Sequence, residues 1–312
     1  MRKTTTTLAI GLIAIFAAAC GSTGGSASPA ASAASGGASN APSAAASASP
    51  AACAKDSLKT ATAGKLTIGT DNPAYPPYFA PNTGGTLTKP WKISDPTNGQ
   101  GFESAVGFAI ADRLGFAKSD VQWIVVPFAN SFAAGPKTFD FDLNQVAYNA
   151  QRAQNVDLSE GYYFGNQSLV VLKTSPLAKA TTIAALKDYV YGAQVGTTSY
   201  DAIAAVIAPS KKALVYDTND LAIKALGNKT IDGVIVDLPT ADYITNVQVQ
   251  NAVIAGQFAG GTPEHFSAVL AKGSPLTDCV NSAIAAMTQD GTLDDLASTW
   301  LPFQDTVPVF KP

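Results

Sequence analysis

Apolar residues follow two different periods along the first part of the folded region. Apolar residues at every second position indicate strands, and apolar residues three or four positions apart indicate helices. On this basis we expect strands at residues 65–71, 121–127 and 139–146, and a helix at residues 103–114 that ends at Gly115. A strand, a helix and a second strand in this order form a parallel βαβ unit, so the pattern predicts an α/β lobe.

A second series of elements begins after the aromatic residues 162–164. The expected strands are 193–195, 213–216, 233–236 and 252–255, and the expected helices are 199–207, 218–226 and 242–246. Because strands alternate with helices here as well, this block predicts a second α/β unit. The rest of the pattern predicts a strand at 266–270 and helices at 276–290 and 293–300.

The chain begins with a short apolar stretch. Two basic residues precede residues 8–19, which are too few to span a bilayer comfortably and fit the hydrophobic core of a signal peptide. The sequence Ala-Ala-Ala-Cys at 17–20 resembles a bacterial lipoprotein cleavage site. We therefore expect removal of residues 1–19 and lipidation of Cys20, which anchors the exported protein to the outer face of the cytoplasmic membrane. The alternative is an ordinary secretory signal with an unrelated cysteine.

The next segment has a different composition. Residues 21–54 are almost entirely Gly, Ala, Ser and Pro and carry no charge. Such a segment buries too little apolar surface to offset its ordering entropy, so we expect residues 20–56 to be a disordered tether. A coil of about 35 residues spans roughly 30–35 Å on average. The tether therefore holds the folded region close to the membrane.

Cysteine pairing bears on how the two units connect. If Cys20 carries lipid, Cys53 and Cys279 remain as an even pair in an oxidising compartment, and a disulfide is their simplest arrangement. Two free thiols are the alternative. A disulfide would return the end of the chain to the first unit, which makes the second unit an insertion.

This connectivity predicts two lobes. We expect lobe 1 to comprise residues 57–166 and 258–312, and lobe 2 to comprise residues 167–257. The chain then crosses between the lobes near residues 164–168 and near residues 257–262. A double crossing forms a hinge with a cleft beside it.

Composition excludes several classes of function. A net charge of −3 argues against nucleic acid as a partner. The single histidine, His265, and two scattered thiols cannot supply the usual zinc ligands, and we expect His265 to be a structural or exposed residue. The sequence contains no Gly-x-Ser-x-Gly elbow, no phosphate-binding loop and no His-Glu-x-x-His pair. We therefore expect no metal, no cofactor and no catalytic residue, and hence no enzyme.

Candidate ligand-binding residues follow the predicted strands, where open α/β sheets bind their ligands. Arg152 follows the strand 139–146, and an arginine can bind both oxygens of a carboxylate. Gly196-Thr197-Thr198 opens a helix, whose backbone N–H groups suit an anion. Asp237 ends the strand 233–236. A cation, an anion-accepting segment and a carboxylate together suit a zwitterionic ligand.

The same residues resemble a known family, the substrate-binding proteins of polar amino-acid ABC importers, solute-binding protein family 3. The resemblance covers about residues 65–302. It rests on a series of motifs in a fixed order, namely Gly69-Thr70-Asp71 with Tyr75-Pro76-Pro77, Gly101-Phe102-Glu103 with Arg113-Leu114-Gly115, the strand Phe139-Asp140-Phe141-Asp142-Leu143, Arg152 with Asp157-Leu158-Ser159 and Tyr162-Tyr163, Gly196-Thr197-Thr198, residues 231–237 ending at Asp237, and Asp290-Gly291-Thr292-Leu293 before Trp300-Leu301.

The resemblance implies a two-lobe α/β fold, the periplasmic-binding-protein-like type II fold, with a hinge and an inter-lobe ligand cleft. It also implies that Arg152 binds the α-carboxylate of the ligand with help from Thr197 and Thr198. By the same resemblance Asp237 accepts the α-ammonium group. Two aromatic residues are expected as walls of the pocket, namely Tyr75 and Phe128.

The sequence departs from the family at one position of the expected site. Family members usually have Ser or Thr five residues before the arginine, and this chain has Ala147. The missing hydroxyl removes one expected contact with an ordinary amino-acid ligand. Gln145 is expected to replace that contact or to recognise another ligand group.

Each expected role has a structural alternative. Arg152 could instead form a surface ion pair with Asp157 or Glu160, and Asp237 could only cap the helix that follows it. Thr197 and Thr198 would cap a helix in either case. The two aromatic residues could belong to the core.

The predicted function is capture of a small zwitterionic ligand, an amino acid, by lobe closure. The resemblance implies delivery to the permease subunits of an ABC importer, and we expect the protein to be a monomer attached to the membrane through its lipid. One alternative is a receptor whose ligand signals or is not an amino acid. Another is a secreted enzyme like cyclohexadienyl dehydratase on the same fold, which would need a positioned acid.

Overall fold

The computed structural model describes residues 53–258, 264–301 and 306–312. All of them belong to one compact unit, Ala46–Pro312. The predicted signal peptide, the lipidation site Cys20 and most of the predicted tether lie outside the described residues. The last residues of that tether are ordered, which corrects the prediction for 53–56. Cys53 forms a disulfide there, and Lys55–Ser57 is a short 3-10 helix.

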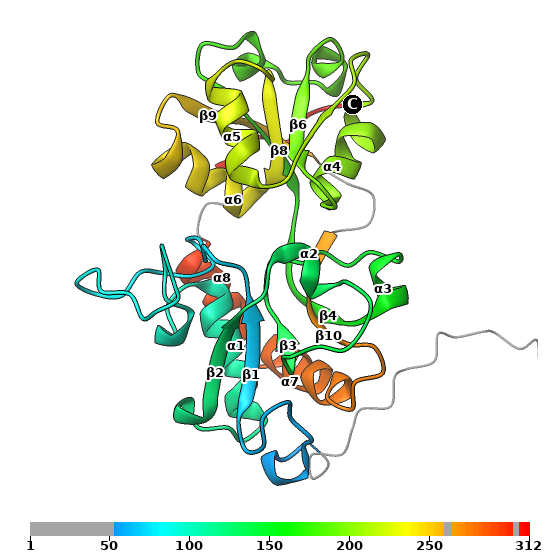
Figure 1. Ribbon diagram of the computed structural model, residues 1–312. Coiled ribbons are helices and arrows are strands. Elements are labelled where there is room, and N and C mark those ends of the chain that lie inside the picture. Colours follow the sequence, from blue (N-terminus) through cyan, green and yellow to red (C-terminus); the bar gives the residue numbers. More distant parts are fainter. Residues whose placement is uncertain (1–52, 259–263, 302–305) are drawn as a thin grey trace, which may run out of the picture. The chain divides into compact units, whose positions relative to one another are not determined.

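The first sheet contains the strands with order β2-β1-β3-β10-β4 (Figure 1). Their bounds are Leu66–Thr70 for β1, Val121–Val125 for β2, Phe141–Asp142 for β3, Val156–Gly165 for β4 and Glu264–Ala271 for β10. Strands β1, β2 and β3 are parallel, whereas β10 is antiparallel to both β3 and β4. The sheet is therefore mixed.

Three helices pack with this sheet in Figure 1: α1 at Phe102–Arg113, α7 at Thr277–Gln289 and α8 at Thr292–Trp300. All five residues of β1 are buried, so this strand has packed side chains on both of its faces. Gly107 of α1 lies against Trp123 of β2, and a Cβ at that position would come within 2.8 Å of the indole ring. The glycine therefore allows the helix to pack closely on the sheet.

The second sheet has the strand order β7-β6-β8-β5-β9. The bounds are Gln167–Leu172 for β5, Tyr191–Gln194 for β6, Leu214–Tyr216 for β7, Gly233–Asp237 for β8 and Ala252–Gln257 for β9. Its helices are α4 at Thr198–Ala202, α5 at Asn219–Gly227 and α6 at Leu238–Tyr243. Strands β6, β7 and β8 are parallel, and β5 is antiparallel to β8 and β9. The predicted two-lobe α/β fold is thus present.

Shorter helical segments connect these elements. The remaining α-helices are α2 at Phe128–Ser131 and α3 at Arg152–Asn155. The 3-10 segments beyond the first are Pro96–Asn98, Lys118–Asp120, Pro176–Lys179 and Ile183–Leu186, and the π-helical segments are Ile203–Ile207 and Ile244–Gln248. No helix in the described part of the chain combines the length and the apolar character needed to cross a membrane.

The structure corrects the predicted secondary structure in three places. The strand expected at 139–146 is reduced to β3, since the chain turns at Gln145, which has a left-handed φ of 50°. The helix expected at 199–207 becomes π-helical from Ile203 onward. Strands β4 and β5 were not predicted, although their antiparallel pairings complete the two sheets.

The predicted disulfide is confirmed. Cys53 and Cys279 are bonded across 226 residues, so the first described residue is joined to α7. This bond closes a very long loop in the unfolded chain, and the chain-entropy model assigns the largest stabilisation to such loops. Residues of α7 and α8 share one hydrophobic core with the first sheet.

The last residues of the chain do not follow those helices. The prediction assigned residues 258–312 to lobe 1, but Phe258 and residues 306–312 pack on the second sheet. Val309 pairs with Gln257, Lys311 pairs with Thr182, and Phe310 lies in the core of the second lobe against the Phe258 ring at 5.1 Å. A third connection between the lobes therefore follows α8.

The C-terminal residues offer a matched test of this correction. Phe310 is 4% exposed and its neighbour Val309 is 48% exposed. We expect Phe310→Ala to lower the free energy of unfolding by about 3 kcal/mol, because it removes a buried ring. Val309→Ala should change it by less than about 0.5 kcal/mol. Urea unfolding followed by fluorescence measures both, and equal effects of the two substitutions would contradict the packing described.

Candidate functional site

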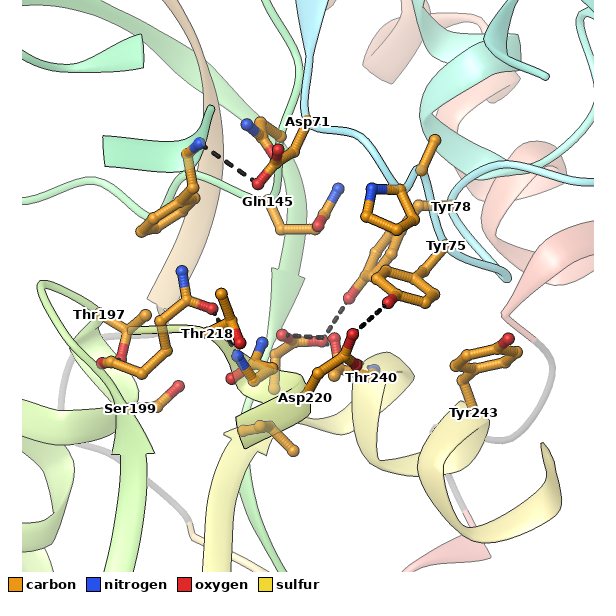
Figure 2. A pocket seen from close by; sticks show the side chains of 18 of the residues that line it. Asp71, Tyr75, Tyr78, Gln145, Thr197, Ser199, Thr218, Asp220, Thr240 and Tyr243 are labelled. Atoms are coloured by element: carbon orange, nitrogen blue, oxygen red, sulfur yellow. Dashed lines mark hydrogen bonds between the residues drawn. The ribbon is translucent and has the colours of Figure 1, made fainter. Parts of the chain in front are cut away.

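A pocket brings the predicted ligand-binding residues together. All of them line it, namely Tyr75, Phe128, Gln145, Ala147, Arg152, Thr197, Thr198 and Asp237. The lining comes from loops that follow strands of both sheets, including the loops after β1, β6 and β8. This placement agrees with the rule that open α/β sheets bind ligands at the carboxyl ends of their strands. Figure 2 shows part of this lining.

Arg152 is the first residue of α3, and its guanidinium group joins the two lobes. The side chain of Asn149 accepts hydrogen bonds from the backbone N–H groups of Gln151 at 2.7 Å and of Arg152 at 3.4 Å, which begins the short helix. One terminal nitrogen of Arg152 donates to the carbonyl of Ala147 at 2.6 Å, and the other donates to the carbonyl of Gly196 in the second lobe at 2.7 Å.

Aromatic rings cover the same guanidinium group. Its central carbon lies 4.4 Å from the ring centroid of Phe132 and 5.6 Å from that of Phe128. Arg152 is only 7% exposed, and burial lowers its pKa to about 10, so the group keeps its charge at neutral pH. The structure places no salt bridge to Arg152 among the residues it describes, and Asp157 pairs with Lys272 instead. The alternative of a surface ion pair with Asp157 or Glu160 is therefore wrong.

Asp237 lines the pocket and also caps a helix. Its carboxylate accepts hydrogen bonds from the backbone N–H of Thr240 at 2.9 Å, from the Thr240 hydroxyl at 2.8 Å and from the Tyr78 hydroxyl. The helix-cap alternative is thus correct, but it does not displace the side chain from the pocket. Burial raises the pKa of Asp237. A carboxylate has about four acceptor positions, so one remains for a ligand donor.

The two threonines are held differently. Thr197 caps α4, because its hydroxyl accepts from the backbone N–H of Tyr200 at 3.2 Å and donates to the carbonyl of Gln194 at 2.7 Å. Thr198 instead donates its hydroxyl hydrogen to the carboxylate of Glu264. The expected helix cap is therefore present at Thr197 and not at Thr198, and both residues line the pocket.

Gln145 is hydrogen-bonded to a buried glutamate. Its backbone N–H donates to Glu103 at 2.8 Å, its side-chain amide donates to the same carboxylate, and Tyr162 donates a third hydrogen bond. One of its two side-chain N–H hydrogens is therefore used within the protein. Ala147 is buried, pairs with Phe266 and offers its carbonyl to Arg152.

Two carboxylates in the pocket were not assigned from the sequence. Asp71 accepts hydrogen bonds from the backbone N–H groups of Asn72 at 2.7 Å and Phe128 at 3.3 Å. Asp220 accepts a hydrogen bond from the Tyr75 hydroxyl at 2.7 Å, and Figure 2 shows this contact with Tyr243 beside it. The motif Gly69-Thr70-Asp71, part of the family resemblance, was a signal for the first residue. No pattern in the sequence indicated the second.

The pocket has an excess of negative charge. Among the described residues, the charged side chains that line it are Asp71, Asp220, Asp237 and Arg152. Arg152 thus supplies a single positive charge against three carboxylates. A simple zwitterion with no further charge would leave this excess uncompensated, whereas a ligand with an additional positive charge would reduce it.

Metal binding finds no support in the described segments. No group of three or more His, Cys, Asp and Glu side chains in these segments could hold a metal ion. His265 is a partly buried residue of β10 whose ring stacks on Tyr148 at 5.4 Å and lies 5.5 Å from the Phe164 ring. It does not line the pocket.

Comparison with known proteins identifies the family. The family model described as bacterial extracellular solute-binding proteins, family 3, matches residues 66–303, which is most of the chain. The chain belongs to this family. It is therefore an extracellular solute-binding protein, as the resemblance in sequence implied.

Individual relatives agree with this assignment. The L-cystine-binding protein TcyJ of Escherichia coli (strain K12) is 27% identical over 247 residues, covering 78% of this chain and 84% of TcyJ. The arginine-binding extracellular protein ArtP of Bacillus subtilis (strain 168) is 26% identical over 218 residues, covering 68% of this chain and 82% of ArtP. Both are named as amino-acid-binding proteins.

A solved structure supports the fold of this solute-binding protein. The ancestral amino acid-binding protein AncCDT-1, described as a precursor of cyclohexadienyl dehydratase, has a TM-score of 0.59 and is 26% identical. The match covers 76% of this chain and 95% of the ancestral protein. The predicted two-lobe α/β fold is confirmed by this similarity together with the two sheets described above.

Glu103, the buried carboxyl group that accepts hydrogen bonds from Gln145, should make the stability of the protein depend on pH. Burial raises its pKa from the ordinary 4.5 to about 7. Between these values the folded state retains a proton that the unfolded state has released, so the free energy of unfolding falls as the pH rises through this window. As the pH rises from about 5 to about 8, we expect the free energy of unfolding to fall less for the Glu103→Gln variant than for the parent. The two decreases should differ by about 3 kcal/mol.

Urea unfolding at a series of pH values measures this difference. The comparison of slopes is informative even if the substitution lowers stability at every pH. Asp142, whose pKa burial also raises, remains in the variant, and the Glu103 charge raises that pKa further, so the difference in slope includes this coupling. Identical slopes for the parent and the variant would contradict a titrating Glu103.

Proposed function

We propose that this protein is the substrate-binding lipoprotein of an ABC importer and that its ligand is an amino acid with a positively charged side chain. The observation that supports the proposal most is the charge of the pocket, in which Asp71, Asp220 and Asp237 accompany a single cation, Arg152. The names of the relatives, which include an arginine-binding protein, point in the same direction.

The backbone of the ligand is proposed to bind between the lobes. Arg152 binds the α-carboxylate with the help of the threonines at 197 and 198, and the free acceptor position of Asp237 takes the α-ammonium. The guanidinium group is well suited to this role because Phe128 and Phe132 fix its plane. Asp237 is likewise held in place by Thr240 and Tyr78.

The side chain of the ligand is proposed to face the other two carboxylates. Asp71 belongs to the first lobe and Asp220 to the second, so a cationic side chain between them is attracted to both lobes. The aromatic faces of Tyr75 and Tyr243, whose ring centroids are 5.7 Å apart, add cation–π attraction. Cationic recognition of this kind does not need the hydroxyl that Ala147 lacks.

Affinity is proposed to depend on lobe closure. Charge-assisted hydrogen bonds contribute about 1.5–3 kcal/mol each, whereas micromolar affinity requires about 8 kcal/mol. Several contacts from both lobes must therefore act together, and closure also removes water from the ionic contacts. Binding of a ligand that touches both lobes shifts the protein toward the closed form, which the permease then recognises.

Export, membrane attachment, oligomeric state and the absence of catalysis are further proposals. The protein is proposed to be exported, lipidated at Cys20, held to the membrane by the segment 20–52 and monomeric. We further propose that it performs no catalysis. The dehydratase alternative needs a positioned acid, whereas the three carboxyl groups that line the pocket, Asp71, Asp220 and Asp237, are all proposed above to recognise cationic groups of the ligand.

Removal of the cation is the first test of this function. Isothermal titration calorimetry with L-arginine, L-lysine, L-glutamine and L-glutamate should show the tightest binding for the two cationic amino acids and none for L-glutamate. Arg152→Ala should weaken binding by about 100-fold or more, because a buried ligand charge loses its partner. Arg113→Ala is the matched control, since Arg113 forms a surface salt bridge with Asp290. Equal binding by both variants would contradict the proposal.

Charge selectivity is the second test. Asp220→Asn keeps the size of the side chain and removes one negative charge, so L-arginine should bind about 5- to 10-fold more weakly. L-glutamine, which has no side-chain charge, should bind with nearly unchanged affinity. The ratio of the two affinities, measured by calorimetry at low salt, separates a charge effect from a general disturbance of the pocket. An unchanged ratio would show that Asp220 does not recognise a side-chain cation.

A further inference from the structure

Glu264 connects the two lobes at one side of the pocket. It is the first residue of β10 and pairs with Gly165 of β4 in the first sheet. Its carboxylate accepts hydrogen bonds from the hydroxyl of Thr198, which begins α4, and from the side-chain amide of Gln167 at 2.8 Å, which begins β5. Both donors belong to the second lobe. Glu264 is therefore bonded across the boundary between the lobes.

In the function proposed above, the Thr198 hydroxyl also helps to bind the α-carboxylate of the ligand. A threonine hydroxyl carries one hydrogen and donates it to one acceptor at a time. In the structure that acceptor is Glu264. A carboxylate bound by Arg152 and Thr198 would have to take this hydrogen bond from Glu264.

Glu264 also acts on Arg152 through its charge. Burial lowers the pKa of Arg152 to about 10, and Glu264 is the charge that opposes this effect most, ahead of Asp201. In return, burial raises the pKa of Glu264 and Arg152 counteracts it, along with the Thr198 hydrogen bond. The two side chains thus lie near enough to interact without a salt bridge in the described part of the chain. A second carboxylate beside Arg152 would be repelled by the first.

We propose that Glu264 is an internal competitor for the α-carboxylate of the ligand, so that it weakens amino-acid binding and eases release. This inference rests on the function proposed above. The alanine at position 147 makes the competition by Glu264 stronger. It lacks the hydroxyl that could otherwise replace the Thr198 hydroxyl as a donor to the ligand. A residue that only held the lobes together would have the opposite effect, since its removal would weaken binding.

Two substitutions and two kinds of ligand test this proposal by calorimetry. Glu264→Gln removes the charge and keeps the shape, and Glu264→Ala removes both the charge and the acceptor. The probes are L-arginine and L-glutamine, with agmatine as the control because it has the amine and guanidinium of arginine but no carboxylate. Thermal melting of each variant confirms that it is folded.

We expect both substitutions to tighten binding of the amino acids by about 5- to 20-fold. Agmatine should bind no more tightly to the variants than to the parent. Weaker or unchanged amino-acid binding by both variants overturns the proposal, and so does an equal gain for agmatine. If the parent binds neither amino acid, the proposed function fails and this inference fails with it. If the parent binds them but the variants do not bind them more tightly, only the inference about Glu264 fails.

Discussion

The site depends on one buried guanidinium group whose neighbours hold it in place. Arg152 is stacked on Phe132 and donates to a backbone carbonyl in each lobe, at Ala147 and at Gly196. Burying a cation is costly, and here the two carbonyls and the aromatic face offset the cost in the absence of a salt bridge within the described segments. Two carboxylates, Glu264 and Asp201, also stabilise the charge from a distance.

The main features of the fold and site could be predicted because they rest on strong local signals. Helix α1 follows from regular apolar spacing, and Arg152 and Asp237 follow from their places after strands. The fully buried β5 has no alternation of apolar and polar residues, so periodicity could not find it. The path of residues 306–312 depends on contacts with Phe258 and Thr182, which no short sequence pattern reveals.

Residues whose roles depend on tertiary contacts were also not identified from the sequence. Asp220 lies in the first turn of α5, a common position for an acidic residue, and only the folded chain brings it to the Tyr75 hydroxyl of the other lobe. Glu264 begins a strand and becomes important only because Thr198 and Gln167 converge on it. Charge near a site is therefore better judged from the folded chain than from the linear order of residues.

The most direct test is a crystal structure of the protein with bound L-arginine. The account predicts that the α-carboxylate contacts Arg152, that the α-ammonium contacts Asp237, and that the ligand guanidinium lies near Asp71 or Asp220. Each contact would fall within ordinary hydrogen-bond distance, about 2.7–3.2 Å. A ligand bound in the reverse direction, or bound without contact to Arg152, would contradict the account.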